Sequence, residues 1–329
     1  MSDLSEAEVS PRALTEGPAE PPPSVFIIGA GVVGTALAVR LAGAGVPVTG
    51  LHGRQVEPTD AARATSSVVG VVRSTGEIPP ILSESDAVII AVRDDRIPEV
   101  ASRLVKEGRL RSGQILLHTS GANPARSILA AALPQVRAVG TLHPLVSFAD
   151  ARVAVEGLSE IAFGIEGDEA ARALARRIVR ALGARPVTLE AENLALYHAG
   201  AVIASNYVVA MAGAARSLLI KAGVPADEAL PVLIPLLGSV VQNLAQLGLP
   251  GALTGPVERG DVTVVERHFG TLAARAPELV ELYRLVGRDV LRLAREKSKL
   301  DPAAAARLEA LFSGAAPVAP ANGGHEPGA

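Results

Sequence analysis

Short runs of β-branched residues alternate with helical patterns from Ser24 to about Leu189. The apolar runs predict buried strands, and the stretches between them predict helices. The expected strands are Val25–Ile28, Val46–Leu51, Val68–Val72, Ala87–Val92, Gln114–His118, Val136–Leu142, Glu160–Ile165 and Arg185–Leu189. The expected helices between them include Val32–Ala44, Ile97–Glu107 and Glu169–Leu182. Alternation of this kind predicts right-handed βαβ units and a largely parallel, doubly wound sheet.

The pattern changes after Leu189, where strand signals stop and long helical stretches follow. These helices are expected at about Glu190–Ala222, Ala226–Leu247, Val262–Ala274, Pro277–Glu296 and Pro302–Phe312, with a loop at Gly248–Pro256. The first helix ends at Gly223-Val224-Pro225, a Gly-then-Pro stop. The predicted fold class is therefore α/β, with the sheet domain at 24–189 followed by an all-helical domain at 190–314.

Both ends of the chain have the composition of disordered segments. Residues 1–23 carry several acids and end in Pro21-Pro22-Pro23, and the tail 315–329 is rich in Pro, Gly and Ala. The first residues lack a basic segment followed by an apolar run, so no signal peptide is expected. We therefore expect a cytoplasmic protein.

Composition excludes several classes of function. Aromatic residues make up 2% of the chain and the formal net charge is −3, which argues against a nucleic-acid partner. The chain has no cysteine, so disulfides, thiolate metal sites and a cysteine nucleophile are excluded. The six histidines form no compact motif such as HExxH, so no metal is expected.

One apolar stretch, Ala195–Ile220, is long enough to span a bilayer. It also carries His198, Ser205, Asn206 and Arg216. A buried helix of a soluble protein is favoured over a membrane span, and no membrane partner is expected.

The run Val25–Ile28 leads directly into Gly29-Ala30-Gly31-Val32-Val33-Gly34, a GxGxxG motif between a strand and a helix. Gly29 permits the tight turn, Gly31 lets the backbone approach a pyrophosphate, and Gly34 allows close packing of the helix on the strand. The phosphates would lie at the helix N-terminus. In this context the motif predicts a Rossmann dinucleotide-binding domain, and a fold of this type that binds nothing is the alternative.

The tip of the second strand distinguishes NADP from NAD. Chains that bind NAD usually place an acid about 20 residues beyond the glycines, on the ribose 2′-hydroxyl. Here Val46–Leu51 leads to His52-Gly53-Arg54, without an acid. Arg54 can form a forked contact with a 2′-phosphate and His52 can add a donor, so NADP(H) is favoured. A solvated Arg54 in a loop is the alternative.

Three further strand ends are expected at the cofactor crevice, where open α/β sheets bind ligands. Small Ala91 and Val92 leave room there for the ribose and nicotinamide, whereas the following Asp94 and Asp95 fit a solvated helix cap equally well. Ser120 can bond a substrate or the nicotinamide carboxamide. His143 can shape the substrate pocket, and a structural role is favoured for His118.

Motifs of this chain occur together in a known family. They are His118-Thr119-Ser120-Gly121, Leu142-His143-Pro144-Leu145, Tyr197-His198 through Ser205-Asn206-Tyr207, and Gly255-Pro256 with Arg259-Gly260-Asp261. Through them nearly all of residues 24–312 resembles a family with a Rossmann-like domain followed by a helical C-terminal domain of unknown function. That family is similar in architecture to ketopantoate reductase, pyrroline-5-carboxylate reductase, and the hydroxyisobutyrate and 6-phosphogluconate dehydrogenases. The resemblance implies the architecture and the cofactor.

The first helix of the C-terminal domain carries a polar stripe. His198, Val202, Ser205 and Asn206 lie at i, i+4, i+7 and i+8, and therefore on one face of an α-helix. Unpaired buried polar groups cost about 1–3 kcal/mol each, so the stripe needs partners. A bound substrate and a polar network between helices both remain open.

The hydroxyacid dehydrogenases that the chain resembles place a catalytic Lys four residues before an Asn, which is Val202 when measured from Asn206. His198 lies one turn earlier and can replace the Lys as proton donor, because imidazole titrates near neutral pH. Asn206 and Ser120 would orient the substrate, and Ser205 would also contact it. Farther along, Asp261 is expected as a helix N-cap, and Arg259 is open as a ligand for a substrate carboxylate.

The leading hypothesis is an NADP(H)-dependent oxidoreductase that transfers a hydride to a small ketone or imine bearing a carboxylate. The alternative is a non-catalytic NADP-binding sensor, which the missing Lys favours and the polar helix face opposes. The helix expected at Glu190–Ala222 is apolar around most of its circumference. This predicts a homodimer built through the helical domain.

Overall fold

The computed structural model describes residues 22–54, 73–147, 161–297 and 300–315. The chain divides into two compact units, Met1–Ile203 and Ala204–Ala329, called here the N-terminal unit and the C-terminal unit. The expected disordered segments 1–23 and 315–329 lie almost entirely outside the described residues.

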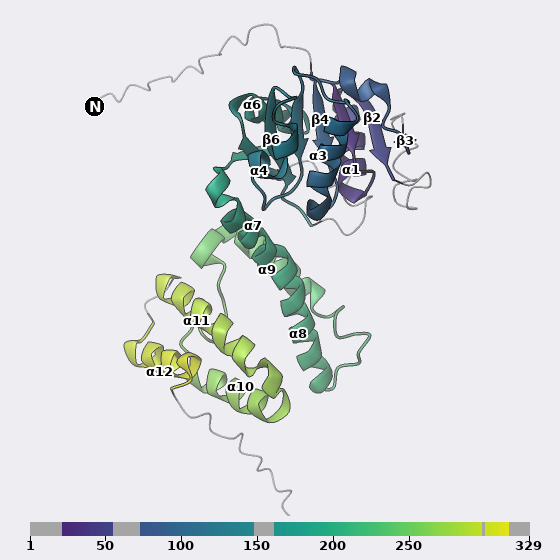
Figure 1. Cartoon of the computed structure of the whole chain (residues 1–329). Helices are drawn as coiled ribbons and strands as arrows, with labels where there is room; N and C mark the ends of the chain where they lie inside the picture. The colour runs from purple at the N-terminus through teal and green to yellow at the C-terminus, as the bar shows by residue number, and fades with distance from the viewer. Residues whose placement is uncertain (1–21, 55–72, 148–160, 298–299, 316–329) are drawn as a thin grey trace, which may run out of the picture. The chain divides into compact units, whose positions relative to one another are not determined.

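An eight-stranded sheet forms the centre of the N-terminal unit within the described ranges (Figure 1). The strands are β1 (Val25–Ile28), β2 (Val48–Gly53), β3 (Arg73–Thr75), β4 (Ala87–Ile90), β5 (Ile115–His118), β6 (Ala138–Pro144), β7 (Ala162–Gly167) and β8 (Arg185–Thr188). Their order is β3-β2-β1-β4-β5-β6-β7-β8, and the pairs are parallel except for antiparallel β6 and β7. The order reverses between β1 and β4, which makes the edge beyond these strands the place for a ligand. The predicted doubly wound sheet is confirmed.

Alternating side chains of β1 show why the sheet is covered on both faces. Val25 and Ile27 point into one core, and Phe26 and Ile28 point into the other. Helices α1 (Val32–Gly43) and α6 (Glu169–Ala181) pack on the first face, and α3 (Ile97–Lys106) packs on the second. Strands buried on both faces form continuous apolar runs, and the sequence pattern therefore detects them.

The observed strand bounds agree with the expected ones to within two residues where both are described, and those of β1 are identical. The start of β2 shows the cause: the Val46 N–H donates to the Leu41 carbonyl and so belongs to the end of α1, not to the sheet. The ladder begins one residue later, with the Val25 N–H on the Pro47 carbonyl. The expected strand Val68–Val72 lies outside the described residues, and β3 begins directly after it.

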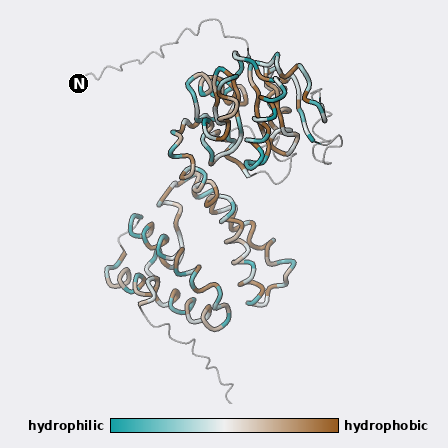
Figure 2. The backbone as a smooth tube through the Cα atoms, in the orientation of Figure 1, coloured by the Kyte–Doolittle hydropathy of each residue, from teal (hydrophilic) through white to brown (hydrophobic). Residues whose placement is uncertain are grey.

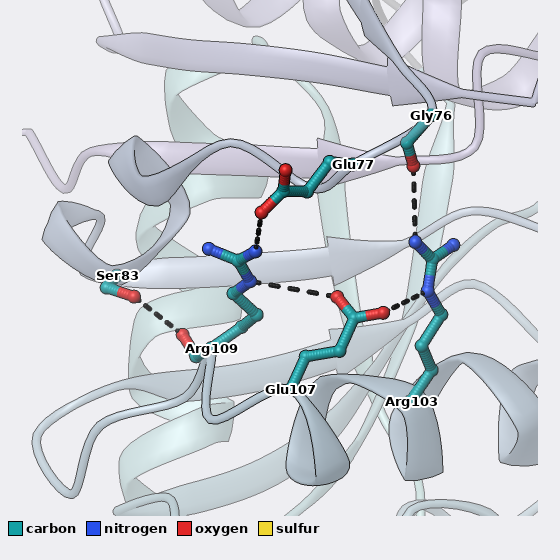
Figure 3. A network of polar contacts seen from close by, with 6 residues as sticks. All are labelled: Gly76, Glu77, Ser83, Arg103, Glu107 and Arg109. Carbon is teal, nitrogen blue, oxygen red and sulfur yellow. Dashed lines mark hydrogen bonds and ion pairs between the residues drawn. The ribbon is translucent and has the colours of Figure 1, made fainter.

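Ion pairs connect the end of α3 to the loop after β3 (Figure 3). Arg103 Nε lies 2.6 Å from Glu107 Oε1, and Arg109 Nη2 lies 2.6 Å from Glu77 Oε1. Arg103 also donates to the Gly76 carbonyl. Because most of these groups are exposed, solvent screens the ion pairs, and each adds little to the stability of the fold. Their main effect is to position the loop after β3 against the end of α3.

The chain after β8 is helical. Its elements are the 3₁₀ turn η4 (Ala191–Asn193), α7 (Leu194–Val202), the π-helical segment η5 (Ile203–Tyr207), α8 (Val208–Lys221), α9 (Ile234–Gly251), α10 (Val262–Arg275), the 3₁₀ turn η6 (Pro277–Leu279), α11 (Val280–Lys297) and α12 (Pro302–Ser313). This confirms the predicted helical C-terminal region. The helix expected at Glu190–Ala222 is observed as Ala191–Lys221. It contains the π-helical segment η5, whose turn holds more residues than an α-helical turn. The α-helical spacing assumed from His198 to Asn206 therefore does not hold.

The second expected helix, Ala226–Leu247, begins only at Ile234. Pro231 and Pro235 each lack the N–H that a continuous helix across them would use, and the chain forms turns up to Leu233. At its other end the backbone leaves helical geometry at Gly248, with φ of 61°, where the loop was expected.

Helices α10, α11 and α12 share a core that contains Phe269, Leu291, Leu308 and Phe312. The N-cap expected at Asp261 is confirmed, since its carboxylate accepts from the Val264 N–H at 3.2 Å. A cap of this kind contributes about 1 kcal/mol.

Hydrophobic residues recur along the backbone of α8 and α9 (Figure 2). Many of their side chains are exposed. Val209 is 73% exposed and Val241 is 66% exposed. The stretch Ala191–Lys221 is long and apolar enough to cross a membrane by length and composition, and 6% of its most apolar window is buried. The stretch expected as a buried helix is therefore largely exposed within the described part of the chain. Helices α10 to α12 bury their apolar faces against one another.

We expect a homodimer in which α8 and α9 provide the interface, because exposed apolar surface on this scale favours association. Val209→Glu and Val241→Glu should each shift the protein toward monomer in sedimentation velocity at micromolar concentration. Ile81→Glu, at an exposed apolar position of the N-terminal unit, is the control and should leave the dimer intact. A monomeric wild type would contradict the prediction.

Candidate active site

The glycine-rich turn between β1 and α1 lies at the ligand-binding edge of the sheet. Gly29 has φ of 120°, and a Cβ there would lie 2.1 Å from the Ala91 carbonyl oxygen. A Cβ on Gly34 would lie 1.8 Å from the Gly29 carbonyl oxygen. A Cβ on Gly31, by contrast, would have nothing within 4 Å among the described residues. The fold requires the first two glycines, whereas the space beside Gly31 is open to a ligand.

The start of α1 suits an anion. Gly31 is its N-cap, no side chain caps the helix, and the first turn contains no acid. The free N–H groups and the helix dipole together attract phosphate. Val32 and Val33 pack against the core, and Ala30 lies against Gly53, where a Cβ would be 2.7 Å from the Ala30 Cβ. The tip of β2 therefore passes directly beside the turn.

The two residues expected at the β2 tip have different surroundings. His52 is buried, with Nδ1 3.0 Å from Ser74 Oγ, and burial lowers its pKa. Arg54 is exposed. Arg54 is thus the residue of the pair that is open to a 2′-phosphate, while the His52 ring is engaged within the sheet.

Sequence reasoning missed Arg73, which begins β3 opposite Leu51. Its Nη2 lies 3.5 Å from Thr35 Oγ1 of α1, and burial lowers its pKa. A second cation therefore lies near the start of α1. The available signal was an Arg directly after the expected strand Val68–Val72, and such residues are common on protein surfaces.

Ser120 joins the ends of β4 and β5. Its hydroxyl donates to Asp94 Oδ2 at 2.5 Å and accepts from Asn123 Nδ2 at 2.8 Å. Asn123 also reaches Asp94 Oδ2 at 3.3 Å. Ser120 is 2% exposed, so its side chain holds the two strand ends together. From the sequence alone, Asp94 fitted a solvated helix cap equally well, and Asn123 was not identified.

A buried chain of hydrogen bonds continues from Ser120. Its backbone N–H donates to His118 Nδ1 at 3.1 Å, so the proton of the neutral ring is on Nε2. That nitrogen donates to Thr141 Oγ1 at 3.1 Å, and the Thr141 hydroxyl donates to Glu166 Oε2 at 3.0 Å. Glu166 also accepts from the Ala125 N–H at 2.9 Å. Both ring nitrogens of His118 are thus satisfied, which agrees with the structural role favoured for it.

A second group of rings lies where β6 meets α7. Tyr197 Oη lies 3.0 Å from His143 Nδ1, and the His198 ring lies edge-on to His143 with centroids 5.9 Å apart. Two glycines make room for these rings. A Cβ on Gly121 would lie 2.8 Å from the His143 ring, and one on Gly164 would lie 2.8 Å from the Tyr197 hydroxyl. Three of the motifs therefore converge at one place.

Burial is the main cause of the low pKa values of two histidines. It lowers the pKa of His118 to about 3, with the charge of His143 as a smaller cause. It lowers the pKa of His143 to about 4, where His198 acts in the same direction and Asp94 opposes. Both rings are neutral at pH 7.

The six predicted catalytic and substrate-binding residues fall into two groups. Ser120, His143 and His198 belong to the N-terminal unit and cluster at its sheet edge, and His198 Nδ1 is buried without a hydrogen-bond partner in the described part of the chain. Ser205, Asn206 and Arg259 belong to the C-terminal unit, where Ser205 Oγ donates to Asn206 Oδ1 at 3.0 Å. The roles of all six stay predictions.

Two family models match the chain. Residues 15–144 match the Rossmann-like domain, and residues 161–290 match the domain of unknown function DUF2520. The chain combines a Rossmann-like domain with a DUF2520 domain. The resemblance carried by its motifs is thereby confirmed. The DUF2520 match begins at β7, before both the boundary expected at Glu190 and the division of the compact units after Ile203.

Solved structures share this architecture. A proposed NADP oxidoreductase from Bacteroides fragilis is 26% identical, with a TM-score of 0.63 over 82% of this chain and 98% of its own. A protein from Thermotoga maritima is 25% identical, with a TM-score of 0.59 over 82% and 99%. Pyrroline carboxylate reductase from Plasmodium falciparum, solved with NADP bound, is 13% identical, with a TM-score of 0.54 over 89% and 100%, and shows the fold alone. A comparison with curated proteins gave no match.

We expect the free energy of unfolding to fall as the pH drops from about 6.5 toward 4. Unfolded histidines take up protons near pH 6.5, whereas the folded pKa values of His118 and His143 are about 3 and about 4. Between these values the unfolded state binds more protons, which lowers stability by about 1.4 kcal/mol per pH unit for each histidine. Urea unfolding at several pH values measures the slope. His118→Gln should make the slope smaller, and a wild-type stability that stays constant down to about pH 5 would refute the account.

Proposed function

We propose that this protein is an NADP(H)-dependent oxidoreductase that transfers a hydride between the cofactor and a small carbonyl or imine compound bearing a carboxylate. The observation that carries the proposal is the glycine-rich turn. Gly29 and Gly34 are enclosed by backbone, while the space beside Gly31 is open in front of an uncapped helix. This is the form that a dinucleotide pyrophosphate requires. The likeness to the proposed NADP oxidoreductase of Bacteroides fragilis supports it.

The residues present fit the cofactor. The turn at Gly31 and the first N–H groups of α1 would hold the pyrophosphate, and exposed Arg54 would bind the 2′-phosphate. Ala91 and Val92, beside the turn, would lie along the ribose and nicotinamide. When bound, the cofactor supplies the hydride, and the protein supplies orientation and charge stabilisation.

Residues at the sheet edge would complete the reaction. His198 is the proposed proton donor, since its ring lies beside His143 and is not held by a fixed hydrogen bond among the described residues. The roles expected for Ser205, Asn206 and Arg259 of the C-terminal unit stay predictions. Homodimer formation and a cytoplasmic location stay predictions.

Gly31→Ala should weaken NADPH binding by about tenfold or more without unfolding the protein. The Gly31 backbone has φ of −80° and its Cβ position is free, so alanine fits the fold but occupies the place of the pyrophosphate. Gly43→Ala, at an equally open glycine at the far end of α1, is the matched control and should bind normally. Titration of NADPH fluorescence measures the affinity of both variants. Equal NADPH affinity in Gly31→Ala and wild type would count against the site.

The wild type should bind NADH about tenfold more weakly than NADPH, because Arg54 favours the 2′-phosphate. The same fluorescence titration with NADH measures this difference.

His198→Ala should lower turnover by about 10²–10⁴-fold, the usual contribution of a general acid, and leave NADPH affinity nearly unchanged. Initial rates of NADPH oxidation with a panel of keto acids and cyclic imines identify a substrate and then measure the variant. His268→Gln, which changes a histidine of the C-terminal unit, is the control. Wild-type turnover in His198→Ala would place the proton donor elsewhere, first at Ser120 or His143.

A further inference from the structure

Two imidazoles of the N-terminal unit each have a hydrogen-bond partner at Nδ1 that can donate. The Ser120 N–H lies 3.1 Å from Nδ1 of His118, and the Tyr197 hydroxyl lies 3.0 Å from Nδ1 of His143. Burial raises the pKa of Tyr197, against a smaller effect of the Gly164 backbone, so the hydroxyl keeps its proton and can donate it. A neutral ring that accepts at Nδ1 carries its own proton on Nε2.

The two rings differ at Nε2. The Nε2–H of His118 donates to Thr141, in a chain that ends on Glu166. The Nε2 of His143 has no hydrogen-bond partner among the described residues. His143 Nε2 is also not among the buried atoms that lack a partner, so it is accessible from outside the described part of the chain. An N–H at this position can therefore donate to an acceptor that a bound ligand supplies.

The surroundings of His143 indicate where that acceptor would be. The ring lies against Gly121, where a Cβ would be 2.8 Å from Nε2. The charges of Asp94 and His198 also act on the pKa of His143, with Asp94 raising it and His198 lowering it. His143 therefore lies among the groups at the ends of β4 and β5 and the start of α7, at the edge where the proposed cofactor would bind.

We propose that Tyr197 is a positioning residue that holds His143 with its proton on Nε2, and that this N–H donates a hydrogen bond to the carbonyl oxygen of the substrate. The inference rests on the proposed function and narrows the substrate class to ketones or aldehydes. A carbonyl oxygen accepts hydrogen bonds, whereas a protonated imine offers only an N–H at that position and would face the His143 donor with another donor.

The role of His143 is electrostatic, and it keeps its proton throughout. As the carbonyl carbon receives the hydride, the π electron pair moves to the oxygen. The His143 N–H stabilises the charge that develops there, and the oxygen then takes the proton of His198, which solvent restores. A fixed neutral donor aimed at developing charge is an effective catalytic device, because it needs no reorganisation during the reaction.

The chain contains a matched control pair. In the C-terminal unit, His268 Nδ1 lies 2.8 Å from Tyr283 Oη, with ring centroids 5.9 Å apart. This contact also joins a histidine Nδ1 to a tyrosine hydroxyl, but it belongs to the other compact unit. Tyr283→Phe therefore removes an equivalent hydroxyl without touching the proposed site.

The first test is the tautomer of His143 in the ¹⁵N-labelled full-length protein at neutral pH. Long-range ¹H–¹⁵N spectra distinguish Nδ1–H from Nε2–H, and the spectrum of His143→Gln assigns the signals. The proposal expects Nε2–H in the wild type and in Tyr283→Phe, and a mixture of tautomers in Tyr197→Phe. An Nδ1–H tautomer in the wild type, or no change in Tyr197→Phe, would overturn it.

The second test is kinetic. His143→Asn should lower kcat by about 10²-fold, the usual effect of removing one such donor. His143→Gln should recover part of this loss, because its amide nitrogen reaches the place of Nε2, whereas that of Asn reaches only the place of Nδ1. Tyr197→Phe should lower kcat more than it changes KM, and Tyr283→Phe should match the wild type. Equal rates in His143→Asn and His143→Gln would contradict the donor role.

Binding of NADPH to the wild type separates the two proposals. If NADPH binds and only cyclic imines are reduced, the proposed function stands and the carbonyl inference is overturned. If NADPH does not bind, the proposed function fails and the substrate class fails with it, while the tautomer measurement still decides the Tyr197–His143 contact.

Discussion

The buried carboxylate of Glu166 fixes the direction of the hydrogen bonds beneath the ligand-binding edge. A carboxylate only accepts, so Thr141 must donate to it, His118 must donate to Thr141 from Nε2, and Nδ1 of His118 must accept from the Ser120 N–H. This series of hydrogen bonds therefore fixes the tautomer of His118. The loop that follows β5, with Ser120 and its bond to Asp94, is held in one arrangement as a result.

The antiparallel strand β7 makes this possible. Its register pairs Glu166 with Thr141 and Gly164 with His143. One strand therefore supplies both the carboxylate that ends the His118 chain and the space for the Tyr197 hydroxyl beside His143. The buried His118 and the proposed substrate-facing His143 are therefore both positioned by β7, although they lie on different strands of the sheet.

Local patterns predicted most of the fold. Continuous apolar runs marked strands that are buried on both faces, the spacing of Gly29, Gly31 and Gly34 marked the dinucleotide turn, and Asp261 was identified as an N-cap from its position before a helix. Each of these features is decided by neighbouring residues. The bounds of a helix failed where prolines intervened, as at Pro231. The α-helical spacing failed where the helix type changes, at the π-helical segment.

The candidate site was predictable only as a set of motifs. That Ser120 bonds Asp94, and that Tyr197 contacts His143 across 54 positions of sequence, depends on strand order and on the antiparallel register of β7. The spacing of residues along the sequence does not reveal contacts of this kind. Glu166 was missed for the same reason: a lone acid in a strand gives no sign that it is buried opposite a threonine.

The π-helical segment Ile203–Tyr207 changes how this chain is aligned with its relatives. A π-type turn closes i to i+5 instead of i to i+4, so it holds an extra residue relative to an uninterrupted α-helix. Counting back four places from Asn206 crosses this segment, and the position reached, Val202, is equivalent to the lysine of the hydroxyacid dehydrogenases in number only. The valine at position 202 is therefore no longer evidence against catalysis. The side chain that replaces the lysine has to be identified by superposing the helix axes, because residue spacing does not identify it.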